Sequence, residues 1–245
     1  MTVTQTLRAD FAPNGTLRAA LNHGNRILVG RGADGTPEGI SVDLAQMLAA
    51  ELDLPLDFVN FDRAVDVSSS ATEDLWDVCF LAVDPKRAET IDFTDPYVGI
   101  EGSYLAGPAC TADDAPALVA SGAAVGTVDG SAYTLTLARQ PGAEALVYFP
   151  TITAMLAALD QGEITAAAGI GDVMAAEAAK RPGARVLTPP FMQIRQAMAI
   201  VRGRPDASAY LRDFVQRLAR AGTTGDILER HGVARACAIV PGDAA

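Results

Sequence analysis

The amino-acid sequence predicts an α/β protein. Segments with the apolar pattern of strands alternate with segments of helical period, which is typical of parallel α/β sheets. The same alternation begins again after Pro108, so the chain contains two similar sets of elements. Hydrophobic residues make up 49% and charged residues 20% of the 245 residues, as in an ordinary globular protein. Two sets around a central break indicate two lobes.

The first set begins with a short strand at residues 17–21 and a glycine-rich loop at residues 24–39. Ser41 is expected to cap the helix that follows, because serine accepts hydrogen bonds from the free N–H groups of a first turn. The strand expected after Pro55 leads to residues 75–83, which are nearly all apolar and predict a strand buried on both faces. The apolar face of the helix is formed by Val42, Ala45, Leu48, Ala49 and Leu52.

The second set repeats this order of strand and helix. Ser131 and Thr151 each stand where a helix begins, and Gly162 ends the second of these helices. The expected strands are residues 124–128, 145–149, 164–170, 185–187 and 197–201. The expected helices are residues 131–139, 151–161, 172–180, 207–221 and 225–231.

The charge and the cysteine content exclude several classes of function. The net charge of −11 argues against a nucleic acid or an anionic membrane as partner, since both require basic patches. The 3 cysteines are widely spaced and only 2 histidines are present, so we expect no metal site and no cofactor. No apolar run reaches the roughly 18 residues of a membrane helix.

The first 16 residues are polar and have no basic segment followed by an apolar one, so no secretory signal is visible. Two alternatives follow: the protein stays inside the cell and is cytoplasmic, or a signal has been removed.

Several ordered motifs resemble family 3 of the extracellular solute-binding proteins, which are the amino-acid receptors of ABC importers. Gly39-Ile-Ser-Val-Asp-Leu-Ala45 is similar to the first-helix motif of that family. Asp77-Val-Cys-Phe-Leu-Ala-Val-Asp-Pro-Lys-Arg87, followed by Ile91-Asp-Phe-Thr-Asp-Pro-Tyr97, resembles its central signature. Val125-Gly-Thr-Val-Asp-Gly-Ser131 resembles the start of its second lobe.

The resemblance implies a two-lobed periplasmic-binding-protein-like (type II) fold, with two α/β lobes joined by two hinge strands. Residues 1–101 and 196–245 would form the first lobe and residues 102–195 the second, with a ligand cleft between them. The linking strands would be residues 102–106 and 195–201. The resemblance also implies a monomer that binds an amino-acid-like solute and interacts with an ABC transporter permease. It further implies a location in the periplasm or at the cell exterior.

The resemblance assigns Arg87 to the ligand carboxylate, which a guanidinium binds as a bidentate fork. The alternative is a surface arginine after the turn at Asp84 and Pro85. The family carries hydroxyl residues before this arginine, whereas this chain has apolar residues from Phe80 to Val83. The resemblance also places Ser131 against the carboxylate, while the alternative is a simple helix cap.

Asp172 is the candidate for the ligand ammonium group, although it lies two positions beyond the strand end where the family has its aspartate. The alternative is a cap of the following helix. Glu101, at the predicted first hinge, would be partly buried and would either bind a cationic ligand or pair with an arginine. The remaining ligand candidates are Asn22 and Asn25 after the first strand, and the aromatic residues Phe80 and Tyr133.

Three functions fit these residues. The first is a binding protein without chemistry, which delivers an amino acid or a related amine or acid to an importer. The second is an enzyme similar to cyclohexadienyl dehydratase, in which Glu101 or His23 would act as the general acid. No recognisable catalytic pair is present, so we expect no enzyme. The third is a cytoplasmic domain that senses or scavenges a ligand.

Overall fold

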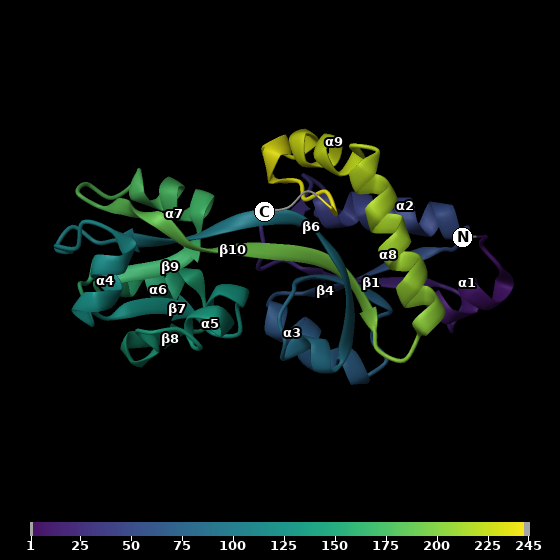
Figure 1. Cartoon of the computed structure of the whole chain (residues 1–245), viewed down its shortest axis with the longest axis horizontal. Helices are drawn as coiled ribbons and strands as arrows, with labels where there is room; N and C mark the ends of the chain where they lie inside the picture. The colour runs from purple at the N-terminus through teal and green to yellow at the C-terminus, as the bar shows by residue number, and fades with distance from the viewer. Residues whose placement is uncertain (1, 243–245) are drawn as a thin grey trace. The chain divides into compact units, whose positions relative to one another are not determined.

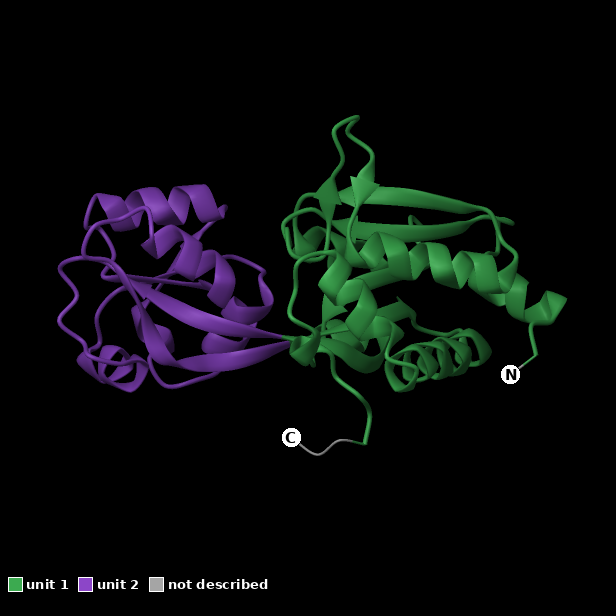
Figure 2. Ribbon diagram, turned by 90° about the horizontal axis from the view of Figure 1, so that it is seen from above, with its two compact units in different colours: residues 1–99, 195–245 green, residues 100–194 purple. Residues whose placement is uncertain are grey.

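The computed structural model describes residues 2–242, which divide into two compact units (Figure 2). One unit contains the chain up to Gly99 and from Arg195 onward, and the other is Ile100–Ile194. Two long strands, β6 (Ile91–Ala106) and β10 (Arg185–Val201), contribute residues to both units. The strands expected at residues 185–187 and 197–201 are therefore one strand. Pro189 and Pro190 lie inside this strand. Because proline has no N–H group to donate to a neighbouring strand, the two residues argued against a continuous strand in the sequence.

The sheet of the first unit has the order β4-β1-β5-β10, with β6 beside β10. Its parallel strands are β1 (Leu17–Asn22), β4 (Leu56–Phe61) and β5 (Val78–Ala82). β10 runs antiparallel to β5. The helices are α1 (Gln5–Phe11), α2 (Ile40–Leu52), α3 (Ala64–Ser69), α8 (Pro205–Arg220) and α9 (Thr223–Arg230).

Helices cover this sheet on both faces, with α3 on one face and α2 on the other (Figure 1). Trp76 lies in the core beneath α3, is 1% exposed, and donates its indole N–H to the Ser70 hydroxyl at 3.1 Å. Cys79 and Leu81 belong to the same core cluster, so Phe80 between them points to the opposite face of β5. Burial on both faces explains the apolar residues of β5, as the sequence predicts. The predicted strand at residues 75–83 is too long, however, because Leu75 and Val83 at its ends are 44% and 45% exposed.

The helix α2 begins differently from the prediction. Its N-cap is Gly39, with φ of 121°, and Ser41 lies in the first turn without capping it. A Cβ atom at Gly39 would lie 2.6 Å from the carbonyl oxygen of Leu28. Only glycine therefore fits this close approach of two backbone segments.

The second unit has the strand order β6-β9-β7-β8. β7 (Val125–Val128) is parallel to β8 (Leu146–Phe149) and to β9 (Ala166–Ile170), whereas β9 is antiparallel to β6. Its core joins Leu105, Met155, Leu159 and Met174 from β6, α6 and α7. The helices of this unit are α4 (Ala115–Ser121), α5 (Ala132–Leu137), α6 (Ile152–Asp160) and α7 (Gly171–Ala178).

Some elements were not expected from the sequence. The helices α1 and α4 have only 7 residues each, and Thr4 and Asp114 cap them. A small hairpin joins β2 (Gly30–Arg31) and β3 (Pro37–Glu38). Single 3-10 turns are found at Ser70–Thr72, Arg87–Glu89, Ala143–Ala145 and Arg235–Cys237. Within residues 2–242, none of the helices combines the length and apolar character needed to span a membrane.

Candidate ligand-binding residues

The first unit gathers two groups of predicted residues at one edge of its sheet. β1 and β5 are parallel neighbours, so their carboxyl ends lie at the same edge. Asn22 is the last residue of β1, and Asn25 follows in the next turn. Arg87 opens the 3-10 turn that comes shortly after β5. Carboxyl ends of strands are where open α/β sheets place their ligands.

Arg87 is not the surface arginine of the alternative interpretation, since it is only 4% exposed. One guanidinium nitrogen donates to the carbonyl oxygen of Ala82 at 3.1 Å. Burial lowers the pKa of Arg87, and the nearby Asp84 carboxylate acts in the opposite direction. Asp84 itself accepts the backbone N–H of Lys86, as the predicted turn requires. Arg87 is thus a buried cation held close to a strand end.

The amides after β1 are buried as well. Asn22 accepts the N–H of Gly24 at 3.1 Å, which shapes the turn. Asn25 is 8% exposed, and no described group hydrogen-bonds its side-chain oxygen. The Nε2 atom of His23 is hydrogen-bonded to the side-chain oxygen of Asn60 at 2.7 Å, so the partner of the imidazole ring is neutral. Phe80 is 3% exposed and packs inside the unit, in line with a core role.

The second unit places Ser131 in a chain of hydroxyl groups. Ser131 is the N-cap of α5 and accepts the backbone N–H of Thr134 at 3.2 Å. The Thr134 hydroxyl contacts the hydroxyls of Ser131 at 2.7 Å and of Thr127 at 2.5 Å. It also donates to the carbonyl oxygen of Val128 at 2.6 Å. Ser131 therefore caps α5, and its hydroxyl also contacts the hydroxyl of Thr134.

Tyr133 lies in the first turn of α5 and is 8% exposed. Burial raises the pKa of Tyr133 to about 12, and a hydrogen bond with Ser131 acts in the opposite direction. The sequence analysis predicted Tyr133 only as an aromatic residue that would contact the ligand.

Asp172 and Glu101 lie near each other in the fold of this unit. Asp172 is in the first turn of α7, whose N-cap is Ile170, so Asp172 is not the cap of that helix. Glu101 is in β6 and is exposed, in contrast to the predicted partial burial. β6 pairs with β9 through Gly102 and Ile170. A Cβ atom at Gly171 would lie 3.5 Å from that of Glu101, which places the two carboxylate-bearing segments side by side.

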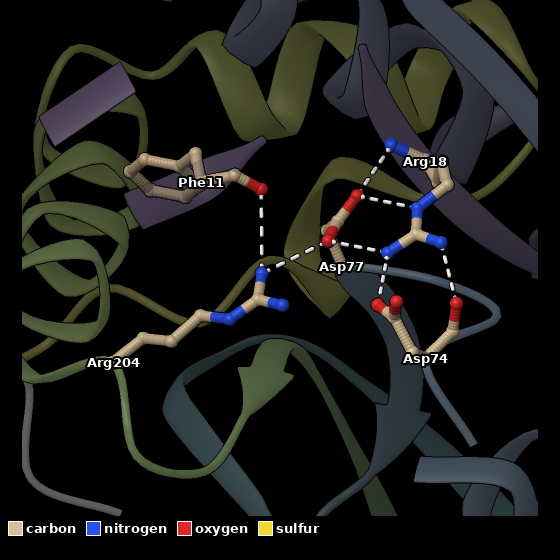
Figure 3. A network of polar contacts seen from close by, with 5 residues as sticks. All are labelled: Phe11, Arg18, Asp74, Asp77 and Arg204. Atoms are coloured by element: carbon tan, nitrogen blue, oxygen red, sulfur yellow. Dashed lines mark hydrogen bonds and ion pairs between the residues drawn. The ribbon is translucent and has the colours of Figure 1, made fainter. Parts of the chain in front are cut away.

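A separate charged network lies at the other end of the first sheet (Figure 3). Asp77 precedes β5, is fully buried, and accepts three hydrogen bonds from Arg18, through its backbone N–H and two guanidinium nitrogens, at 2.9–3.0 Å. Arg204 donates to the same carboxylate at 2.9 Å. Because Arg18 lies near the start of β1, this network is distant from the carboxyl ends of the strands. Asp77 is thus structural, although the sequence shows it only as an interruption of an apolar run.

The sequence interpretation missed Thr127 and Thr134. Both are buried hydroxyl residues, with 0% and 3% exposure, and they organise the surroundings of Ser131. A Ser-x-x-Thr pattern at a helix start was the available signal. Within residues 2–242, no group of three His, Cys, Asp or Glu side chains is arranged to hold a metal ion.

The chain is similar in fold to solved amino-acid receptors. An amino acid ABC transporter substrate-binding protein from Streptococcus pneumoniae, bound to L-arginine, is 22% identical with a TM-score of 0.72, covering 93% of this chain and 98% of its own. A mutant of the arginine-binding protein ArgBP from T. maritima is 18% identical with a TM-score of 0.75, covering 92% and 99%.

A third similar structure is the ancestral amino acid-binding protein AncCDT-1, a precursor of cyclohexadienyl dehydratase. It is 20% identical with a TM-score of 0.74, covering 93% of this chain and 99% of its own. No curated protein sequence gives a significant match. These structural likenesses confirm the predicted two-lobed, periplasmic-binding-protein-like α/β fold.

The sequence itself matches a family model over most of its length. The matched segment, residues 28–234, includes the motif at residues 39–45, the buried strand before Arg87 and the helix start at Ser131. The resemblance inferred from these motifs is confirmed. This chain belongs to the bacterial extracellular solute-binding proteins, family 3.

Proposed function

We propose that this protein binds an amino acid, or a closely related small amine or acid, and delivers it to an ABC importer as a monomer outside the cytoplasm. In the first unit, the side chains expected to contact a ligand are Arg87 and the amides of Asn22 and Asn25. In the second unit, the expected contacts are Ser131, Tyr133, Asp172 and Glu101. Phe80 would support the ligand residues of the first unit from within its core. No metal, cofactor or nucleic acid is needed for this role.

The burial of Arg87 at the carboxyl end of β5 carries the proposal. A guanidinium remains charged at neutral pH, and removing it from water is costly unless other groups compensate the charge. The carbonyl of Ala82 and the charge of Asp84 are among the groups that compensate it. A ligand carboxylate would add a bidentate partner of opposite charge. Membership of an extracellular solute-binding family supports the same role.

We propose binding without catalysis. Expulsion of water from a dehydratase substrate requires a general acid held against the leaving group. Glu101 is exposed, and His23 is hydrogen-bonded to the neutral amide of Asn60. Neither arrangement is an acid–base pair. Likeness to a dehydratase precursor at 20% identity concerns the fold alone.

A thermal-shift screen tests the proposal. The panel contains the common amino acids, small amines, dicarboxylates, arogenate and prephenate. A ligand at about 1,000 times its Kd stabilises the folded protein by about 4 kcal/mol. For a chain of this size, that stabilisation raises Tm by about 10 °C. We expect such a shift with one class of amino acid.

Arg87→Ala is expected to abolish the shift, and Arg87→Lys to retain part of it, because lysine keeps the charge but not the fork. Arg220→Ala is the matched control, since Arg220 is exposed on α8 and donates a hydrogen bond to Gln216. Circular dichroism shows that each variant is folded. A parent protein that responds to no amino acid, or turnover of prephenate or arogenate, would contradict the proposal.

A further inference from the structure

Gln196 is a polar residue in an otherwise apolar part of the first sheet. It lies on β10 and is 5% exposed, and residues 197–200 after it are all apolar and buried. Within residues 2–242, its side-chain amide is not hydrogen-bonded to another residue. The amide atoms are not among the fully enclosed polar atoms, so the amide is the end of the side chain that reaches the surface. Because burial of an amide without a partner is costly, the packing of the unit alone does not explain a glutamine here.

The register of β10 against β5 fixes where this amide lies. Gln196 is opposite Ala82, the last residue of β5. In the next pair, the N–H of Val83 donates to the carbonyl oxygen of Arg195 at 2.9 Å. Ala82 and Gln196 therefore form a pair without mutual backbone hydrogen bonds, in which the Cβ atoms lie on the same face about 4.5–5.5 Å apart. The methyl group of Ala82 leaves room for the longer glutamine and cannot hydrogen-bond it.

Ala82 is also the neighbour of Arg87. Its carbonyl oxygen accepts a hydrogen bond from the Arg87 guanidinium at 3.1 Å. In a pair without mutual hydrogen bonds the backbone groups point away from the partner strand, so this carbonyl faces away from β10. The Arg87 guanidinium and the Gln196 amide thus lie on either side of the end of β5. Both are at the carboxyl edge of the parallel strands β1 and β5, where α/β sheets place their ligands.

A carboxylate at this strand end can accept more hydrogen bonds than Arg87 donates. An ionised carboxyl group has two oxygens with about four lone-pair sites, and a guanidinium fork occupies two of them. The side chains at the end of β5 are apolar and donate nothing, namely Leu81, Ala82 and then Val83. The amide nitrogen of Gln196 has two hydrogens to donate. It supplies from β10 the kind of donor that β5 lacks.

We infer that Gln196 contacts the ligand directly, and that its amide N–H group donates to the same carboxylate that Arg87 binds. The inference rests on the proposed function and adds a residue of β10 to the ligand-binding residues of the first unit. Gln196 is then a determinant of specificity, because it favours ligands that carry a carboxylate over the corresponding amines.

Matched ligands test which group of the ligand Gln196 contacts. Each set contains an amino acid, the amine that lacks its carboxylate, and the acid that lacks its α-amino group. One set is L-arginine, agmatine and 5-guanidinopentanoate, and the other is L-glutamine, 4-aminobutanamide and 4-carbamoylbutanoate. Calorimetric titration gives the affinities. Gln196→Met, which keeps the length of the side chain without the amide, should weaken binding of the amino acid and the deaminated acid by about tenfold or more, as for loss of a hydrogen bond to a charged group. It should leave the amine unchanged.

Two further variants control this result. Gln46→Met makes the same substitution at an exposed residue of α2 in the same unit and should change no affinity. Gln196→Glu places a carboxylate beside Arg87, where it competes with that of the ligand, and should weaken the acids more than Gln196→Met does. Circular dichroism shows that each variant is folded. Equal weakening of the acid and the amine in Gln196→Met, or no change in any affinity, would overturn the inference.

A second measurement needs no identified ligand. Nitrogen–proton correlation spectra resolve the side-chain amide of Gln196, assigned by its loss in Gln196→Met, and the Nε–H group of Arg87. Acetate is the probe, because it offers a carboxylate alone, and chloride at equal ionic strength is the control. We expect both signals to shift together with acetate. A shift of Arg87 alone would overturn the inference and leave the proposed function standing. If neither signal responds and the parent protein binds no member of either set, the proposed function fails and the inference with it.

Discussion

Replacement of Asp77 by asparagine is expected to destabilise the first unit without changing its fold. The carboxylate is fully buried, and four hydrogen bonds from Arg18 and Arg204 converge on it. Asparagine has nearly the same size but is neutral and offers only one acceptor oxygen. Its amide N–H groups would face guanidinium groups, which have no acceptor. Two cations would then remain near each other without their buried counter-charge.

The magnitude follows from the burial of the partners. Removing one member of a buried ion pair costs about 3–5 kcal/mol. The side chains of Arg18 and Arg204 are 18% and 16% exposed, so water partly solvates them after the change. We therefore expect the low end, about 3 kcal/mol. For a protein of this size that corresponds to a decrease in Tm of about 10 °C.

Trp76 provides an assay specific to this unit, because it is the 1 tryptophan of the chain and lies in the core beside Asp77. Urea unfolding followed by its fluorescence gives the free energy of unfolding. Asp213→Asn is the control, since that carboxylate is 38% exposed and pairs with Arg217 on the helix surface. Such a pair contributes about 0.5 kcal/mol. Equal losses in the two variants would refute the role given to the buried network.

Three more outcomes are expected. Gly126→Ala should destabilise the second unit by about 1–3 kcal/mol in calorimetric unfolding, because a Cβ atom there would lie 2.4 Å from Ile164; a Tm equal to that of the parent would contradict this packing. Ser70→Ala should cost about 1–3 kcal/mol, since the buried indole N–H of Trp76 loses its acceptor, and urea unfolding at neutral pH measures it; an unchanged midpoint would argue against this bond. Hydrogen bonds from Lys180 and Arg181 lower the pKa of Glu177 below its ordinary 4.5, so the stability it supplies is present at neutral pH and lost as the pH falls below that value. The stability difference between the parent and Glu177→Gln should therefore be larger at pH 7 than at pH 3, and a difference independent of pH would count against the ion pair.

The sequence predicted the order of most strands and helices because they carry local signals. Apolar runs such as residues 78–82 and the helical spacing of α2 do not depend on distant contacts. Elements without such signals were missed. The helix α1 is short. The prolines inside β10 prevented the prediction of a single strand of 17 residues, which pairing with its neighbours stabilises.

For the candidate site, the sequence identified positions but not environments. Arg87, Ser131 and Asp172 stand near strand ends or helix starts, which motifs and turn residues indicate. Their surroundings depend on residues far along the chain. The burial of Arg87 and the exposure of Glu101 follow from packing, which no local pattern records.

The sequence by itself determined the family, the α/β class and the residues at the strand ends, because these are written in short motifs and in hydrophobic period. Tertiary structure alone decided which groups form hydrogen bonds and ion pairs with each other. Asp77 accepts from Arg204, 127 positions away. The Thr134 hydroxyl donates to the carbonyl oxygen of Val128 and lies 2.7 Å from the Ser131 hydroxyl, and these contacts depend on distances of tenths of an ångström. Sequence spacing carries no information at that scale, since it is the packing of β7 against α5 that sets these distances.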